Sequence, residues 1–534
     1  MLERVVESWL DKANERTFEA PFCHMLAAEG HTVVHLTRHC AMELGKDVLS
    51  IAPDGVPCAY QLKGAPGSKI GLKRWREEIQ PQVLDLVTGV IVHPSVPLTG
   101  EAHRSYLVTN GELEEEVIRA IEDMNAGFAA RGMTDRRLLT IVRGELLKKA
   151  RDLETNLWPT DPPDVKELLE LHLEEGDGPL PKAKLARLIE WVMPQAAEVR
   201  APDKELDRLI ASAAVLCALA VASFSRRGNS WAQIEAWTLY AGYVLGLAER
   251  HGLAERIWRR QFAIAERQIY DLLLRLSAEV REAPHLVEGS PLTDGLVYGF
   301  RMMLLLGLMS VLALWPPLPE GDERDHGFLR EFCERHRSRT MCWSEGSIPC
   351  LVAQFWHLRL HDATMRPDLL LRELVAQVSR AHARRGGGAL ASAYYDLTDV
   401  LPYTLGIADA PIRESFAGRS YSLEGLVHLF ARRMWRQEMR FLWPDISRVR
   451  FVRFYPQQRA DFFRWHCAQG VTRDLQPHHT QSWGELLRAA EESEGACIPE
   501  TAREFPAFVL LYLLVCPHRM NAEVLRWLDG RLAR

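Results

Sequence analysis

The chain has 534 residues, more than one compact hydrophobic core usually holds, so we expect at least two domains. Hydrophobic residues make up 47% and charged residues 25% of the sequence, which is ordinary for a globular protein. The formal net charge of −6 excludes a global electrostatic attraction to nucleic acid. Any such binding has to come from a local patch of cations.

The ten cysteines are scattered without a repeated short spacing, so we expect reduced thiols. The first 19 residues form a charged amphipathic start rather than a signal peptide, and we expect a cytoplasmic location. Three apolar segments fall short of the roughly 18 residues typical of a membrane span, namely 209–224, 302–315 and 505–517. We expect them to be buried helices, with no stable membrane insertion.

The first 150 residues alternate between helical and β-like patterns. A helix-like start is followed by β-rich runs at 31–37, 47–52, 56–63, 89–94, 105–110 and 138–142. Helical patterns stand between them, at 72–87 and 112–132. This alternation predicts an α/β domain in which helices flank a sheet.

The character of the sequence changes after residue 150. The acidic, proline-bearing stretch 151–181 is typical of a linker, and residues 182–534 have helical spacing almost throughout. We therefore expect a large all-α region, with a possible sub-boundary near 315–327. A degenerate helical solenoid remains an alternative for this region.

Residues 45–64 suggest a chemical site. Pro53-Asp54-Gly55 is typical of a turn and lies between two expected strands. Side chains alternate along a strand, so Gln61 and Lys63 point to the same face of the second strand. Pairing across the turn brings Asp47 beside them. An Asp carboxylate and a Gln side-chain oxygen are ligands for Mg²⁺ (or Mn²⁺), and a lysine nearby can orient a water molecule or stabilise developing charge.

One further acidic residue, Glu19, lies on the expected helix before the first strand and is positioned to project toward this metal. The set Phe18-Glu19, Gly45-Lys46-Asp47 and Gln61-Leu62-Lys63 resembles the PD-(D/E)XK nuclease superfamily, in particular its Mrr-like restriction endonuclease branch. The resemblance covers about the first 145 residues. It implies a restriction-endonuclease-like fold, metal binding by Asp47 and Gln61, and catalytic roles for Glu19, Asp47, Gln61 and Lys63.

Two alternatives to this interpretation stay open. In the first, Asp47 caps a turn while Gln61 and Lys63 lie on a solvated strand face. In the second, the domain is a degenerate nuclease fold that binds nucleic acid without cutting it. Four cations follow the hairpin and are candidates for holding the DNA backbone, namely Lys69, Lys73, Arg74 and Arg76. The competing interpretation is a solvated helix face paired with Glu77 and Glu78.

Other motifs are weaker. Residues 432–465 contain nine arginines and nine aromatic residues, which suits nucleic-acid or nucleotide contact. Lys204 is the last lysine of the chain, however, so every later Lys or Arg position is an arginine, and codon bias also explains the arginines of this stretch. We therefore favour a packed pair of helices whose arginines reach out to solvent. The spacings of Cys333, His336, Cys342 and Cys350 match no compact zinc site, so a buried core is expected there. His478-His479 lies in a polar loop and is a weak metal candidate. Residues 384–388 lack the Lys-Ser/Thr of a phosphate-binding loop and are expected to break a helix.

The leading hypothesis is a Mg²⁺-dependent endodeoxyribonuclease acting on DNA in restriction or antiviral defence, with a helical module that senses, positions or oligomerises. We expect a homo-oligomer and, as possible partners, other defence proteins. The alternative hypothesis is a non-cleaving nucleic-acid-binding scaffold in a multi-protein complex.

Overall fold

A computed structural model of the chain describes residues 2–36, 46–91, 93, 96, 103–153, 162–193, 203–284, 295–317, 321–336, 342–361, 366–383, 390–395, 400–402, 418–465, 470–491 and 497–532. Its contacts divide the chain into two compact units. Unit 1 comprises Met1–Val244, Leu253–Asp271 and Leu318–Gly321, and unit 2 comprises Leu245–Gly252, Leu272–Pro317 and Asp322–Arg534. The compact unit thus runs past residue 150, and the boundary expected there stays a prediction.

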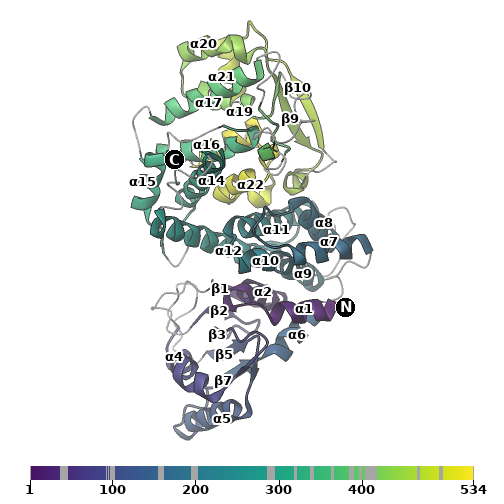
Figure 1. Cartoon of the computed structure of the whole chain (residues 1–534), viewed down its shortest axis with the longest axis vertical. Helices are drawn as coiled ribbons and strands as arrows, with labels where there is room; N and C mark the ends of the chain where they lie inside the picture. Colours follow the sequence, from purple (N-terminus) through teal and green to yellow (C-terminus); the bar gives the residue numbers. More distant parts are fainter. Residues whose placement is uncertain are drawn as a thin grey trace. The chain divides into compact units, whose positions relative to one another are not determined.

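Unit 1 contains a five-stranded mixed sheet in the order β1-β2-β3-β5-β7 (Figure 1). Its strands are β1 Thr32–Leu36, β2 Val48–Ile51, β3 Pro57–Lys63, β5 Arg104–Thr109 and β7 Leu138–Ile141. The first three strands pair antiparallel, and β3, β5 and β7 pair parallel. Parallel strands need long crossovers, and helices supply both of them. The expected mixed sheet with flanking helices is therefore confirmed.

One predicted strand does not appear among the described residues of its run. Val90, Ile91 and His93 of the run 89–94 lie outside any strand, and residues 92 and 94 fall outside the described part of the chain. The run is apolar but short, and it directly follows a helix that ends at Thr88.

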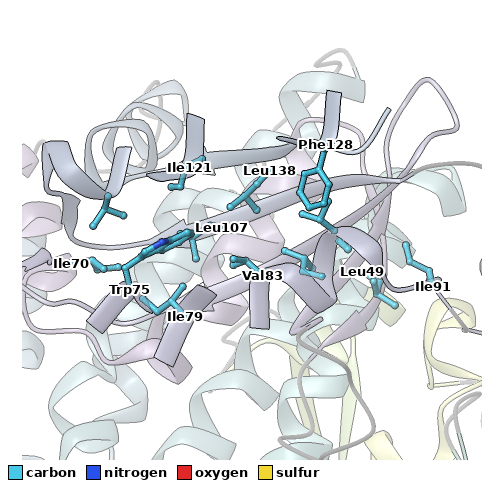
Figure 2. Close-up of a cluster of buried hydrophobic side chains, with 14 of the residues drawn as sticks. Leu49, Ile70, Trp75, Ile79, Val83, Ile91, Leu107, Ile121, Phe128 and Leu138 are labelled. Atoms are coloured by element: carbon cyan, nitrogen blue, oxygen red, sulfur yellow. The ribbon is translucent and has the colours of Figure 1, made fainter. Parts of the chain in front are cut away.

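The helices around this sheet are α1 Leu2–Leu10, α2 Glu15–Ala28, α3 Leu72–Arg74, the π-helical segment η2 Trp75–Ile79, α4 Gln80–Thr88, α5 Glu115–Ala130 and α6 Arg143–Asp152. Two short strands, β4 Lys69–Ile70 and β6 Glu112–Leu113, pair parallel in a separate sheet. The side of the sheet that carries Ala59 is filled by a hydrophobic cluster from η2, α4 and α5. Figure 2 shows this cluster, with Trp75 and Phe128 among the buried side chains.

The opposite side of the sheet is covered by α2. Tyr60 stacks on Tyr106 of the neighbouring strand at 4.9 Å between ring centroids, and Phe22 of α2 meets Tyr60 edge-on at 5.4 Å. Asn14 caps the start of α2 by accepting a hydrogen bond from Thr17 N at 3.0 Å. The sheet is thus buried on both faces, as expected for its parallel half.

Helices continue unit 1 beyond the sheet, namely α7 Pro162–Leu173, α8 Lys182–Val192, α9 Asp203–Ala220, α10 Ala222–Arg226, and parts of α11 Ser230–His251 and α12 Glu255–Glu282. The stretch 151–181, expected as a linker, therefore contains a helix. Lys182 and Glu235 form a buried ion pair at 2.8 Å between α8 and α11.

Unit 2 is mainly helical. Its elements include α14 Gly295–Leu314, α15 His326–His336, η5 Glu345–Ser347, α16 Ile348–His361, α17 Arg366–Ala383, α19 Leu423–Arg432, α20 Arg436–Ile446, η6 Arg459–Phe463, α21 Trp483–Glu491, η7 Glu500–Ala502, α22 Pro506–Val515, η8 Pro517–Arg519 and α23 Ala522–Leu532.

A three-stranded sheet interrupts these helices, which the all-α expectation for residues 182–534 missed. It consists of β8 Arg419–Ser420, β9 Arg450–Pro456 and β10 Gly470–Leu475. The predicted helix pair over 432–465 is instead α20 followed by β9, whose aromatic and β-branched residues favour a strand.

The three apolar segments singled out in the sequence fall in buried helices. They lie largely within α9 and α10, α14, and α22, whose side chains are mostly inaccessible to solvent. Among the helices of the described residues, none combines the length and apolar composition that crossing a bilayer requires.

Candidate active site at the end of the hairpin

The pairing of β2 with β3 positions Asp47 and Gln61. Val48, the first residue of β2, pairs with Tyr60, and Asp47 and Gln61 are the next residues along the two chains. The Asp47 N–H donates to the Tyr60 carbonyl at 2.9 Å, which holds Asp47 against the end of β3. Gln61 Nε2 then donates to Asp47 Oδ2 at 2.6 Å, and Leu62 N donates to the same oxygen at 2.6 Å. The two residues that the sequence placed together do lie together.

This pair is buried. Asp47 is 8% exposed and Gln61 2% exposed, so Gln61 does not lie on the solvated strand face that the competing interpretation gave it. The Asp47 carboxylate accepts the Leu62 backbone N–H and so stabilises the end of the hairpin. Asp47 therefore has a structural contact whatever its chemical role.

Lys63 is half-buried at the last position of β3. Side chains alternate along a strand, so Lys63 leaves β3 on the same face as Gln61. Among the described residues, no hydrogen bond or ion pair holds its ammonium group. The structure thus provides a cation on the face that carries the Asp47–Gln61 pair, at the end of the strand.

Glu19 comes from a different direction. It is 7% exposed on α2, the helix that covers the face of Tyr60 rather than the face of Gln61. One turn earlier on α2, Glu15 Oε2 accepts a hydrogen bond from Gly64 N at 3.3 Å, so this part of α2 lies near the end of β3. The role of Glu19 in the outer shell of the site stays a prediction.

The four candidate DNA-contacting cations follow the site. Lys69, Lys73 and Arg76 are exposed, as contact with a phosphate backbone requires. Arg74 is half-buried, and its guanidinium donates to Glu78 at 3.1 Å and to the Gly64 carbonyl at 3.0 Å. Arg74 thus links the crossover helix to Gly64, the residue after Lys63. Its contact with Glu78 is one that the competing interpretation, a solvated helix face paired with Glu77 and Glu78, expects.

Sequence reasoning missed Asn110, the residue after β5. It is fully buried, and its Nδ2 donates to the carbonyls of Leu10 and Ala13 at 2.6 and 2.8 Å. Its Oδ1 accepts from Ala65 N at 2.8 Å. Asn110 therefore fastens the α1–α2 turn and the loop after Lys63 to the sheet. The sequence Asn110-Gly111 gives a turn signal only, because all its partners are distant in sequence.

The donor set fits a hard cation in one respect. Gln61 Oε1 is buried and has no hydrogen-bond partner, and a buried acceptor of this kind is commonly satisfied by a water or an ion. Among the described residues, no group of three or more His, Cys, Asp and Glu side chains gathers to hold a metal. A cation here would therefore rely on Asp47, on the Gln61 oxygen, on backbone carbonyls and on water.

The cysteine and histidine motifs do not form a metal site among the described residues. Cys333 is in contact with Ser310 at 3.5 Å, and burial raises the pKa values of Cys333, Cys342 and Cys350 to about 12, so these thiols stay protonated. His478 Nδ1 is engaged by Thr480. Residues 384–388 lie outside the described part of the chain.

Comparison with known proteins adds no relative. Neither the protein-family models, nor the curated proteins, nor the solved structures contain a match to this chain.

Proposed function

We propose that the chain is a metal-dependent endonuclease that cleaves DNA phosphodiester bonds, with Asp47, Gln61 and Lys63 as its catalytic residues. The observation that supports this best is the buried Asp47–Gln61 pair, in which Gln61 Oε1 has no hydrogen-bond partner. A carboxylate and an amide oxygen at the end of a strand, followed by a lysine on the same face, suit hydrolysis of a phosphodiester.

Each residue has a distinct part in this proposal. Asp47 and Gln61 would hold the Mg²⁺ or Mn²⁺ ion, which when bound neutralises the phosphate and acidifies water. The Leu62 N–H fixes the orientation of the Asp47 carboxylate. Lys63 orients the attacking water or stabilises the negative charge that develops on the phosphate. The exposed cations Lys69, Lys73 and Arg76 attract the DNA backbone.

The biological setting proposed is restriction or antiviral defence, with unit 2 as a sensing or oligomerising module. This rests on the resemblance of the Phe18-Glu19, Asp47 and Gln61-Leu62-Lys63 set to Mrr-like nucleases. A homo-oligomer is part of the proposal because cutting both strands takes two sites.

A second candidate function is a nucleic-acid-binding scaffold that does not cut. One observation favours it, namely that Asp47 Oδ2 is already satisfied by two donors from the protein itself. In that case the Asp47–Gln61 pair only locks the hairpin.

A cleavage assay separates the two functions. The full chain is incubated with supercoiled plasmid, linear duplex and single-stranded DNA in Mg²⁺ or Mn²⁺, with EDTA as the metal-free arm. We expect EDTA-sensitive nicking that Lys63→Met abolishes and that Lys204→Met, at an exposed lysine of α9, leaves unchanged. Equal cleavage by wild type and Lys63→Met would overturn the catalytic assignment, and salt-sensitive binding without cleavage would favour the scaffold.

A further inference from the structure

A second place in the molecule, in unit 2, has the features of a ligand site. A cavity of about 910 Å³ opens between α20 and the N-terminal end of α21. Small-molecule sites commonly span about 300–1,000 Å³, so the cavity is large enough for a ligand of nucleotide size. None of the residues proposed for the nuclease reaction belongs to its wall.

The wall of this cavity is cationic. Arg436, Arg440 and Arg448 line it, and no Asp or Glu does. Arg436 and Arg440 are exposed and form no ion pair with another described residue, while Arg448 faces Asp445 only at 3.8 Å. Arg436 and Arg440 lie one helical turn apart and so are neighbours on one face of α20. The two guanidinium groups of Arg436 and Arg440, which have no carboxylate partner among the described residues, favour an anion with several oxygens, such as a phosphate.

The same wall is aromatic. Trp443 and Trp483 line the cavity, both only partly buried. The indole of Trp443 is held in place because its Nε1 donates to the His479 carbonyl at 3.1 Å. Next to the cavity on α20, Phe441 is 84% exposed and lies one turn from Gln437 of the wall. Nucleic-acid bases stack on aromatic rings of this kind while arginines hold their phosphates.

The carboxylate of Glu485, the first acidic residue of α21, is engaged by the protein itself and so repels an anionic ligand only weakly. Glu485 accepts hydrogen bonds from Ser482 N at 2.7 Å and from Ser482 Oγ at 2.8 Å, so its carboxylate closes the N-terminus of α21. The backbone donors there are thus partly occupied, and the arginines are the groups available to an anion.

We propose that this cavity, which we call the α20–α21 cavity, binds a phosphorylated nucleoside, with its phosphates on Arg436 and Arg440 and its base against Trp443 or Trp483. The ligand is either a free nucleotide or one unit of a single strand. This proposal is independent of the proposed nuclease reaction, because it uses other residues and requires no metal.

Fluorescence anisotropy tests the proposal on the full chain in EDTA, where no metal-dependent cleavage takes place. The probes are an ATP analogue labelled on its ribose and a fluorescein-labelled ten-residue oligothymidylate. We expect at least one probe to bind, and the tighter of the two identifies the source of the ligand. Binding of neither probe would overturn the proposal.

Variants of the wall show where the probe binds. Arg436→Gln combined with Arg440→Gln should weaken binding about tenfold or more, since it removes both guanidinium groups that hold the phosphates. Arg330→Gln, at an exposed arginine of α15 outside the cavity wall, should bind like wild type. For the oligonucleotide, the double variant should also reduce the slope of log K against log salt by about 0.7 per lost phosphate contact. Unchanged affinity in the double variant would place the ligand elsewhere and overturn the proposal.

A second pair of variants tests whether the base of the ligand stacks on Trp483. Trp483→Leu keeps an apolar side chain without a stacking face and should weaken binding, whereas Trp483→Phe should retain most of it. An oligoglutamate peptide should compete poorly with the labelled nucleotide. If that peptide competes as well as unlabelled nucleotide does, the α20–α21 cavity recognises acidic polypeptide rather than nucleotides, which would overturn the proposal.

Discussion

The carboxylate of Asp47 and the side-chain amide of Gln61 are joined by a buried hydrogen bond of 2.6 Å across the β2–β3 hairpin. The same carboxylate oxygen accepts the Leu62 N–H, so it stabilises the hairpin and is also the acidic group of the candidate site. A useful variant of Asp47 has to separate these two contributions.

Asp47→Asn makes that separation. Asparagine keeps an acceptor for the two donors but removes the negative charge, so the free energy of unfolding should change by less than about 1 kcal/mol. Cleavage should fall at least about 100-fold, because a metal ligand loses its charge. The measurements are urea unfolding and plasmid nicking. Asp54→Asn, in the exposed turn of the same hairpin, is the matched control and should keep full cleavage. Full cleavage by Asp47→Asn would refute its role in the reaction.

Gln61→Glu tests the cation directly, without reference to cleavage. The new carboxylate would stand within hydrogen-bonding distance of Asp47, and two buried like charges repel each other. We expect a lower melting temperature in EDTA and a recovery with Mn²⁺ that exceeds any shift of the wild type. Mn²⁺ titration by differential scanning fluorimetry measures both. A variant that melts at the same temperature with and without the ion would argue against a metal at this pair.

The hairpin was predictable because its information is local. The turn Pro53-Asp54-Gly55 and the alternation in Pro57–Lys63 fix the register up to Val48 and Tyr60, and the residues next to that pair, Asp47 and Gln61, are then close enough to bond. The sheet in unit 2 was not predictable in this way. Its strand β10 pairs with β9 across an intervening segment, and arginines spread along 432–465 mask the alternation of β9. Strand pairing of this kind depends on distant partners that a local pattern does not contain.

Asn110 illustrates the same limit at the level of one side chain, and it leads to a third prediction. Asn110→Asp keeps an acceptor for Ala65 N but loses both donors, and it turns a buried carboxylate oxygen toward the carbonyls of Leu10 and Ala13. We expect unit 1 to lose about 3 kcal/mol or more of its unfolding free energy. Urea unfolding and proteolysis of the α1–α2 turn measure the change.

The matched control for that change is Asn125→Asp. Asn125 also bonds the backbone with both ends of its amide, accepting from Leu138 N at 2.9 Å and donating to Leu138 O at 3.0 Å. It is only partly buried, so the cost should be about 1 kcal/mol. Equal costs at the two positions would contradict the clamping role of Asn110.

A buried polar cluster in unit 2 gives a fourth prediction. Glu345 is 1% exposed, and it accepts hydrogen bonds from Ser420 Oγ, from Ser422 Oγ at 3.0 Å and from Tyr421 N at 3.1 Å. Burial raises the pKa of Glu345, but the nearby His382 and these donors outweigh it and hold the pKa below its usual value.

Glu345→Ala removes the acceptor for all three donors and should destabilise unit 2 by about 3 kcal/mol or more. Hydrogen exchange of the α19 amides in Leu423–Arg432 measures the loss. Glu331→Ala, at an exposed ion pair of α15, should change stability by less than about 0.5 kcal/mol. Protection of α19 that survives Glu345→Ala would show that the cluster contributes little.

His24 predicts a pH dependence for unit 1. Its Nδ1 donates to Gln261 Oε1 at 2.5 Å, its ring stacks on Trp237, and its Nε2 is buried without a partner. Burial lowers the pKa of His24 from 6.5 to about 4. Protonation is therefore harder in the folded state than in the unfolded state. The stability that His24 contributes is complete above pH 6.5 and is lost as the pH falls from 6.5 toward 4, by about 3 kcal/mol.

Hydrogen exchange of the α2 amides at pH 7 and pH 5, corrected for intrinsic rates, measures this loss. His24→Leu should flatten the pH dependence of unit 1 while leaving that of unit 2. In unit 2, burial lowers the pKa of His428 to about 3, with a smaller contribution from the charges of Arg526 and Arg453. The stability of unit 2 should therefore also fall as the pH falls, independently of His24. If α2 in the His24→Leu protein loses protection below pH 6.5 as steeply as in the wild type, another group controls the acid sensitivity of unit 1.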